Sequence, residues 1–258
     1  MIYVRFEWRD SVRYGRMPSS GGTRVEVLTG DPIRGSAVPD GRAVGVEEVR
    51  MLAPLVPGKI IAVGRNYGDH IAETGMGAPV VPRLFFKPPS SVIGPAESIV
   101  CPRQSHQVEH EAELAVVIGR TARNVASEQA LDHVFGYTCA NDVTARDIQK
   151  ADGQPSWAKA FDSFCPLGPV IATGLDPTGL DVSCHVNGAL TQHANTSLML
   201  TSVADLVAYI SAAVTLDPGD VILTGTPAGV GPITPGDEVA VTVAGVGTLR
   251  NPVVSGAQ

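Results

Sequence analysis

The sequence predicts a β-rich α+β protein, and three observations support this fold class. Segments rich in Val, Ile and other strand-forming residues outnumber segments with helical periodicity. Strands do not alternate regularly with helices, which argues against a doubly wound sheet or a (βα)8 barrel. Pro-Gly-Asp triplets at 218–220 and 235–237 are typical of turns between strands. With 258 residues, 44% of them hydrophobic, the chain is long enough to bury a large core.

The first 56 residues are predicted to form a small domain of short strands. MIYVRFEW and TRVEVL have strand composition, and SSGG and TGDP are turn sequences. The segment VRMLAPLVPGK follows as a connector, because prolines at positions 54 and 57 limit regular structure. We therefore predict a small N-terminal β domain at 1–56 and a larger domain at 57–258.

The larger domain is predicted to begin with a buried strand in KIIAVG and a second strand in RLFFK, with a helical turn from His70 to Glu73 between them. VEHEAELAVVIG is predicted to be a strand that enters the core. Amphipathic helices are predicted for SEQALDHVFGY, capped by Ser127, and for SVADLVAYISAAV, capped by Ser202. DVILTGTP and DEVAVTVAGVGTLRNPVV complete the domain with strands.

Charge and composition exclude several classes of protein. The formal net charge of −7 argues against a nucleic-acid binder that relies on phosphate contacts. The apolar runs fall far short of the roughly 20 residues that a membrane span needs, and the N-terminus lacks the apolar region of a signal peptide. The four cysteines lack metal-ligand spacing and are expected to be reduced, buried thiols. We expect a cytoplasmic protein that binds neither nucleic acid nor membrane.

A row of acidic residues in VEHEAEL is the first candidate for a functional site. Alternate side chains of a strand share a face, so Glu109, Glu111 and Glu113 are expected to lie together. A divalent cation would relieve their repulsion, and ligation by carboxylates alone suits Mg²⁺, Mn²⁺ or Ca²⁺. An exposed edge strand whose acids pair with neighbouring arginines is an equally good interpretation of this segment alone.

Asp142 could supply a third carboxylate to such a site. It follows the apolar segment GYTCA, which places it at the end of a strand, where functional sites commonly form. The alternative is an N-cap for a helix in TARDIQ, and the residues alone favour this second interpretation.

His70 and Glu73 are three residues apart and could face one another on a helical turn. A carboxylate beside an imidazole orients the ring and stabilises its protonated form, as a general base requires; a surface pair is the alternative. The turn at 65–67, just upstream, is a usual place for ligand contacts. Lys87 and Lys159, two of only four lysines, lie among apolar and aromatic neighbours, where a lysine either extends to solvent or binds an anion.

The glycine-rich segment TGTPAGVG at 224–231 follows a predicted strand, and its N–H groups and Thr hydroxyls could hold a carboxylate. It lacks the lysine and the spacing of a phosphate-binding loop, so it gives no nucleotide signal. The sequence contains no GxSxG motif, and no cysteine has an obvious His partner, which argues against a covalent Ser or Cys hydrolase.

In their order along the chain, seven segments resemble the motifs of the fumarylacetoacetate hydrolase family. They are GRNYGDHIAE, FFKPPSSVIGP, EAELAVVIG, NDVTARDIQ, AKAFDSFCPLGP, VNG and LTGTPAGVGP. The resemblance covers about 57–254, and so many ordered motifs make it highly specific. The first 56 residues resemble the short N-terminal domain of the bacterial two-domain members.

The resemblance implies a mixed β-sandwich roll that forms a homodimer. It implies Mg²⁺ or Mn²⁺, with Ca²⁺ as a substitute, bound by Glu111, Glu113 and Asp142. It makes His70 and Glu73 a dyad that activates water, carried on a lid that becomes ordered over bound ligand. The family places further polar groups around metal, substrate and pocket at the positions that are here Lys159, Arg146, Gln149, Arg65, Tyr67, Lys87 and Thr226. The segment TQHANTS departs from the family pattern, and we assign His193 no role.

A metal chelated by the carboxylate and 2-oxo group of an α-keto acid is a Lewis acid that would stabilise an enolate. The leading hypothesis is therefore C–C bond hydrolysis of an acylpyruvate-type α-keto diacid, with His70 deprotonating water and Lys159 stabilising the oxyanion. Oxaloacetate decarboxylation, and isomerisation or decarboxylation of 2-hydroxyhepta-2,4-diene-1,7-dioate in aromatic catabolism, use the same chemistry and stay open. The non-enzymatic alternative is a metal-dependent dicarboxylate-binding protein without turnover.

Overall fold

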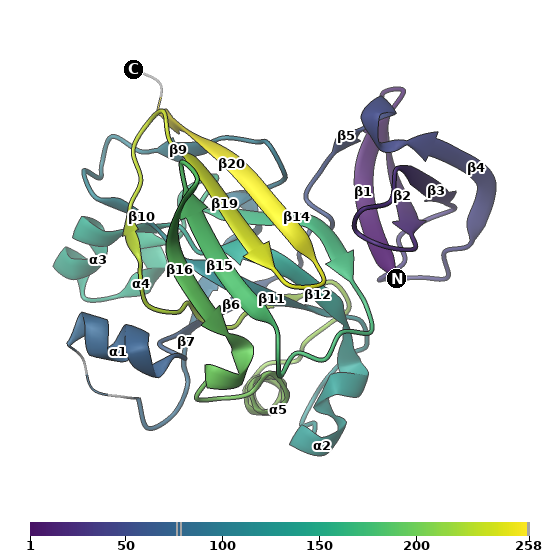
Figure 1. The fold of residues 1–258 in the computed structure, drawn as a ribbon. Coiled ribbons are helices and arrows are strands. Elements are labelled where there is room, and N and C mark those ends of the chain that lie inside the picture. Colours follow the sequence, from purple (N-terminus) through teal and green to yellow (C-terminus); the bar gives the residue numbers. More distant parts are fainter. Residues whose placement is uncertain (76, 78, 257–258) are drawn as a thin grey trace.

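The computed structural model describes residues 1–75, 77 and 79–256, in which three β-sheets are flanked by short helices (Figure 1). The β-rich α+β fold class is therefore confirmed. None of the described helices has the length and apolar composition needed to cross a bilayer. The four cysteines are free thiols, of which all but the partly exposed Cys101 are buried.

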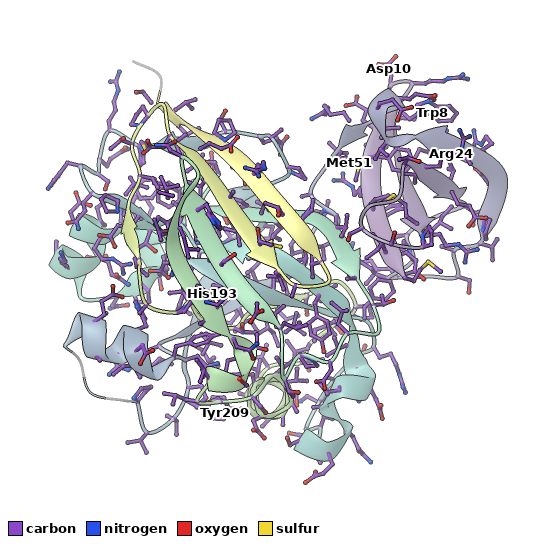
Figure 2. All side chains as sticks on the ribbon, viewed as in Figure 1. Trp8, Asp10, Arg24, Met51, His193 and Tyr209 are labelled. Carbon is purple, nitrogen blue, oxygen red and sulfur yellow. The ribbon has the colours of Figure 1, made fainter. Side chains whose placement is uncertain are left out.

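The first strands form a group that stands apart at the upper right of Figure 1. They are β1 (Ile2–Trp8), β2 (Ser11–Met17), β3 (Arg24–Leu28), β4 (Pro39–Gly45) and β5 (Arg50–Met51). Trp8, Asp10, Arg24 and Met51 mark this group in Figure 2. The group joins the rest of the molecule where β1 pairs with β14 (Cys165–Ala172), so it continues the large sheet.

The large sheet continues from β14 in a fixed strand order. Its further strands are β12 (Val134–Asn141), β11 (Ala112–Ile118), β17 (Val221–Leu223), β6 (Ile60–Gly64) and β7 (Arg83–Lys87), with β8 (Val92–Ile93) beside β14. The five-stranded sheet has the order β16 (Ala189–Asn195), β15 (Asp181–Val186), β19 (Glu238–Val243), β20 (Gly247–Ser255) and β9 (Ile99–Cys101). The smallest sheet has the order β13 (Thr144–Ala145), β10 (Val108–His110) and β18 (Gly231–Pro232).

The helices are short, and they lie around the sheets (Figure 1). They are α1 (Gly68–Thr74), α2 (Ser127–Ala130), α3 (Arg146–Asp152), α4 (Pro155–Ala158) and α5 (Val203–Ala213). Single 3₁₀ turns occur at Val46–Glu48, Pro89–Ser91, Leu131–His133 and Thr196–Leu198. The predicted helical turn from His70 to Glu73 is confirmed within α1, and Ser202 caps α5 as predicted, since its hydroxyl accepts from the N–H of Asp205.

The continuous apolar run of β11 is explained by burial on both faces. Leu114 and Val116 belong to the core that β11 shares with the five-stranded sheet, whereas Ala115 and Val117 pack into a second cluster on the opposite face. Side chains alternate across a strand, so covering both faces buries every position of β11 and accounts for its apolar composition, with Glu113 as its one charged residue.

The predicted helix SEQALDHVFGY is wrong in its second half. The α-helix ends at Ala130, and β12 begins at Val134, where aromatic and β-branched residues pair with β11. Ser127 is not the cap either, because the helix begins at Ser127 itself and its hydroxyl donates to Asp205 Oδ1 at 2.6 Å. Strand pairing in the centre of the sheet outweighs the weak helical periodicity of this short segment.

The segment VEHEAELAVVIG forms two strands instead of one. β10 and β11 belong to different sheets and are separated at Glu111, whose N–H donates to Asn141 Oδ1 at 2.9 Å.

The strand directions bring several strand ends together. β6 runs parallel to β17, and β11 runs antiparallel to β17 and β12. The ends of β6, β12 and β17 and the start of β11 therefore meet at one edge of the large sheet.

Leu114 offers a test of this packing, because it is fully buried at the centre of the molecule. We expect Leu114→Ala to lower the free energy of unfolding by about 2–5 kcal/mol through lost burial and the cavity left behind. Leu190→Ala is the matched control, since Leu190 is 58% exposed, and it should change stability by less than about 0.5 kcal/mol. Urea denaturation followed by fluorescence measures both, and equal effects would contradict the assigned core.

Candidate active site

Three carboxylates converge at the sheet edge where the strand ends meet. Glu111, at the break between β10 and β11, Glu113 on β11 and Asp142 after β12 each place one oxygen within 4.8 Å of the others. All three are at most 5% exposed, and β11 lies between β12 and β17, so the interpretation as an exposed edge strand is wrong. Asp142 is not a helix cap either, because α3 begins after Ala145 without a side-chain cap.

Buried cations surround these carboxylates. Lys159 Nζ lies 2.8 Å from Glu111 Oε2 and 2.6 Å from Asp142 Oδ2, and Lys87 Nζ lies 2.6 Å from Asp142 Oδ1. Arg146 pairs with Glu111 and, through Nε at 2.6 Å, with Glu109. The cluster thus contains four carboxylates, those of the metal-type triad and Glu109, against three cations, which leaves one negative charge uncompensated.

Glu113 carries that uncompensated charge. Its side chain accepts a hydrogen bond from the Gly225 N–H at 2.7 Å, and it forms no ion pair within the described residues. Burial and the charges of Asp142 and Glu111 raise the pKa of Glu113 well above its usual range. Burial also opposes ionisation of Glu111, but Lys159 and Arg146 outweigh it and lower the pKa of that carboxyl to about 2.

The residues of this cluster fit a hard divalent cation. Three carboxylates without His or Cys are the ligand type that Mg²⁺, Mn²⁺ and Ca²⁺ prefer. The unpaired, buried carboxylate of Glu113 is costly without a positive partner, and a cation between the three side chains would supply one.

The cluster opens into a cavity of about 920 Å³ that also contains the histidine pair. His70 and Glu73, on α1, line the same cavity as Glu111 and Asp142. His70 Nδ1 lies 3.1 Å from Glu73 Oε2, and the ring is largely buried. Because Nδ1 is engaged by the carboxylate, the second ring nitrogen is the one left to exchange a proton with a ligand.

The glycine-rich segment at 224–231 connects the two parts of the cavity. The Gly225 N–H holds Glu113, and the Gly229 N–H donates to Glu73 Oε1 at 3.1 Å. The carboxylates that this loop binds therefore belong to the protein itself. A side chain at position 229 would collide with β16, because its Cβ atom would lie 2.0 Å from the Thr191 carbonyl oxygen. Glycine at this position therefore allows the loop to approach β16 closely.

Gln192 is a site residue that sequence reasoning missed. Its Oε1 accepts from the Ala112 N–H at 2.9 Å, and its Nε2 donates to Thr226 Oγ1 and the Pro227 carbonyl, each at 2.8 Å. It thus connects the backbone between Glu111 and Glu113 to the glycine-rich loop. The neighbouring His193 is exposed on β16 (Figure 2) and is not among the residues that line the cavity.

The remaining predicted site residues divide into two groups. Arg65, Arg146, Gln149, Lys159 and Thr226 line the cavity, whereas Lys87, Glu113 and Tyr67 do not. Lys87 lies behind Asp142 with a fully buried side chain, so the structure gives it an ion pair instead of a ligand contact. The Tyr67 hydroxyl is buried without a hydrogen-bond partner, and burial together with the charge of Glu113 raises its pKa.

A β-rich fold in which a buried carboxylate cluster opens into a cavity lined by an imidazole–carboxylate pair is typical of an enzyme. The chain belongs to the fumarylacetoacetate hydrolase family. The family model described as fumarylacetoacetate (FAA) hydrolase C-terminal matches residues 59–254, and the model described as Rv2993c-like, N-terminal matches residues 1–54.

Similar proteins include enzymes of this family. Protein Rv2993c of Mycobacterium tuberculosis is 51% identical over 217 residues, which cover 83% of this chain and 82% of that protein. Oxaloacetate tautomerase fahd2 of Xenopus laevis is 45% identical over 219 residues, covering 80% of this chain and 69% of the relative. The crystal structure of 5-carboxymethyl-2-hydroxymuconate delta-isomerase from Mycobacterium smegmatis has a TM-score of 0.93 at 44% identity, covering 99% and 100% of the two chains.

Glu113→Gln tests the charge balance without any assay of activity. The raised pKa means that the folded, metal-free protein binds this proton more tightly than the unfolded chain, so its stability falls as pH rises above about 4.3. Glutamine does not ionise, so the stability of the variant does not fall in this way. We expect the variant to be more stable than the wild type at pH 7 in EDTA. Added Mn²⁺ should stabilise only the wild type.

Urea denaturation between pH 5 and pH 8, with EDTA or with Mn²⁺, measures both effects. Glu128→Gln is the matched control, because Glu128 is exposed on α2, and it should behave as the wild type does. Stabilisation of the Glu113→Gln variant by Mn²⁺ to the same extent as the wild type would contradict the assigned metal ligand.

Proposed function

We propose that the protein is a Mg²⁺- or Mn²⁺-dependent enzyme that moves a proton at the carbon next to the 2-oxo group of an α-keto diacid. The reaction would be keto–enol tautomerisation or the related isomerisation of an unsaturated diacid. The observation that carries this proposal is the position of His70 and Glu73 in the wall of the cavity that also contains Glu111 and Asp142. The tautomerase and isomerase among the similar proteins support the reaction type.

A divalent cation held by Glu111, Glu113 and Asp142 would supply a Lewis acid beside the 2-oxo group of the substrate. His70 would accept the proton from C3 on its free ring nitrogen. It would return a proton to the enolate oxygen, which gives the enol, or to a more distant carbon, which gives the isomer. Glu73 would hold the ring in position and stabilise its positive charge, and the Gly229 N–H would keep Glu73 in place. Burial of the ring would exclude competing water.

Lys159 and Arg146 would adjust the charge of the site without changing their own protonation. Both form ion pairs with Glu111. Burial opposes the positive charge of each side chain, but the acidic partners outweigh it and leave the pKa of each cation above its usual value. With all four carboxylates ionised the cluster has a net charge of −1, so a bound divalent cation would make it +1. An anionic substrate would then be attracted into a protein whose total charge is −7.

Hydrolysis of a C–C bond in an acylpyruvate-type substrate is the second candidate. The cavity of about 920 Å³ has room for a substrate with a second acyl chain and for a water molecule. His70 would then deprotonate that water, and Lys159 would stabilise the oxyanion. The two reactions differ in products, because only hydrolysis releases pyruvate from an acylpyruvate.

A steady-state assay on EDTA-stripped protein with Mg²⁺ or Mn²⁺ restored tests the proposal. We expect metal-dependent acceleration of the keto–enol conversion of oxaloacetate, followed by absorbance, and no pyruvate release from acetylpyruvate or fumarylpyruvate. His70→Gln should lower the rate by about 10²–10⁴-fold, the usual contribution of a positioned base. His193→Gln is the control and should leave it unchanged.

Pyruvate release from an acylpyruvate, lost in His70→Gln, would establish the hydrolase instead. Full tautomerase activity in EDTA would exclude the metal-dependent proposal, and full activity of His70→Gln would exclude the assigned base.

A further inference from the structure

Two arginines lie next to each other at the cavity wall, where β6 ends and β7 begins. Arg65 directly follows β6, and Arg83 opens β7 opposite Gly64. Both line the cavity, and neither forms an ion pair with any described carboxylate. Burial and the neighbouring charge of Arg83 lower the pKa of Arg65, as expected for two like charges held close together.

Apart from Lys150, the other charged groups of the cavity are already paired. Arg146 and Lys159 are bound to the carboxylates of the cluster, and Glu73 is bound to His70. Lys150, the remaining cation of the lining, lies on α3 beside the Gln107 side chain. Arg65 and Arg83 are thus two adjacent positive charges without an acidic partner among the described residues.

The backbone holds Arg65 in place at some conformational cost. Arg65 has a φ of 65°, in the left-handed region that residues with a side chain seldom adopt. The next residue, Asn66, is fixed by hydrogen bonds from its Nδ2 to the Thr201 and Thr224 carbonyls and from the Thr201 N–H to its Oδ1. A strained conformation that its neighbours enforce is common at ligand sites.

The distance from this pair to the carboxylate cluster suits a ligand with two anionic ends. In the large sheet β6 is two strands and β7 three strands away from β11, which corresponds to about 10 and about 14 Å at the usual spacing between strands. The ends of both strands open into the same cavity. The backbone of an α-keto diacid is long enough for its two ends to approach both places once the arginine side chains extend toward it.

We propose that Arg65 and Arg83 form the subsite for the second carboxylate of the substrate, the one remote from the 2-oxo group. This inference rests on the proposed function, since it assigns the α-keto end to the Glu111–Glu113–Asp142 cluster. Guanidinium groups bind carboxylates through paired N–H donors, so the two side chains would select diacids over monoacids of equal length. Arg83 would then be a specificity-determining residue outside the seven motifs.

Binding of two probes that differ only at the remote end tests the subsite. 2-Oxoglutarate and 2-oxopentanoate share the α-keto head and the chain length, and only the first has a second carboxylate. With Mg²⁺-loaded wild type, calorimetry should give 2-oxoglutarate the lower Kd by about tenfold or more, the usual effect of a charge-assisted hydrogen bond. Arg65→Gln/Arg83→Gln should abolish this preference while the Kd of 2-oxopentanoate stays within about twofold.

Two controls separate direct contact from general electrostatics. Arg120→Gln removes one positive charge from the exposed end of the segment after β11, outside the cavity, and should preserve the preference. Arg83→Lys keeps the charge and should retain part of it. A general electrostatic effect would instead weaken both probes in the double variant, since both are anions.

The outcomes distinguish the subsite from the proposed function. Binding of 2-oxopentanoate to the wild type without a preference for 2-oxoglutarate overturns the subsite alone. A preference that survives in the double variant also overturns it, and so does an equal loss for both probes. Failure of both probes to bind the Mg²⁺-loaded wild type overturns the proposed α-keto acid function together with the subsite.

Discussion

The burial of four carboxylates beside three cations, at the break between β10 and β11, is the constraint on which the site depends. Charges removed from water are tolerated only when each has a partner. In this cluster the carboxylates outnumber the cations by one. Glu113 is the member without an ionic partner among the described residues. The folded chain therefore retains an electrostatic cost at one point, which is the point where a cation can bind.

The sheets hold these charges in register through ordinary backbone interactions. The N–H of Asp142 donates to the Glu111 carbonyl at 2.8 Å, which fixes the end of β12 against the break in the neighbouring chain segment. Gln192 supports the same region from the five-stranded sheet, with its amide bonded on both sides. The cavity is thus assembled from segments far apart in sequence, and each contributes one or two groups.

Local patterns were sufficient to predict β11, the turn that contains His70 and Glu73, and the cap of α5, because their signals lie within a few residues. The helix predicted over SEQALDHVFGY failed because strand pairing across the sheet decides the state of Val134 onwards. The family resemblance supplied the triad, since spacing alone favoured a helix cap for Asp142. Neither source indicated Gln192 or the position of Lys87 behind Asp142, which depend on contacts between distant strands.

The two sides of the cavity differ in their exposure to solvent, and this difference affects how a cation and a substrate would share the site. The Glu73 side chain is 40% exposed and accepts a hydrogen bond from the Gly229 N–H, whereas Glu111 and Asp142, which line the same cavity, are at most 5% exposed. A cation between these carboxylates would therefore face the space that a substrate occupies. A bound substrate would cover that cation, so the metal would exchange with the buffer more slowly in the presence of substrate than in its absence.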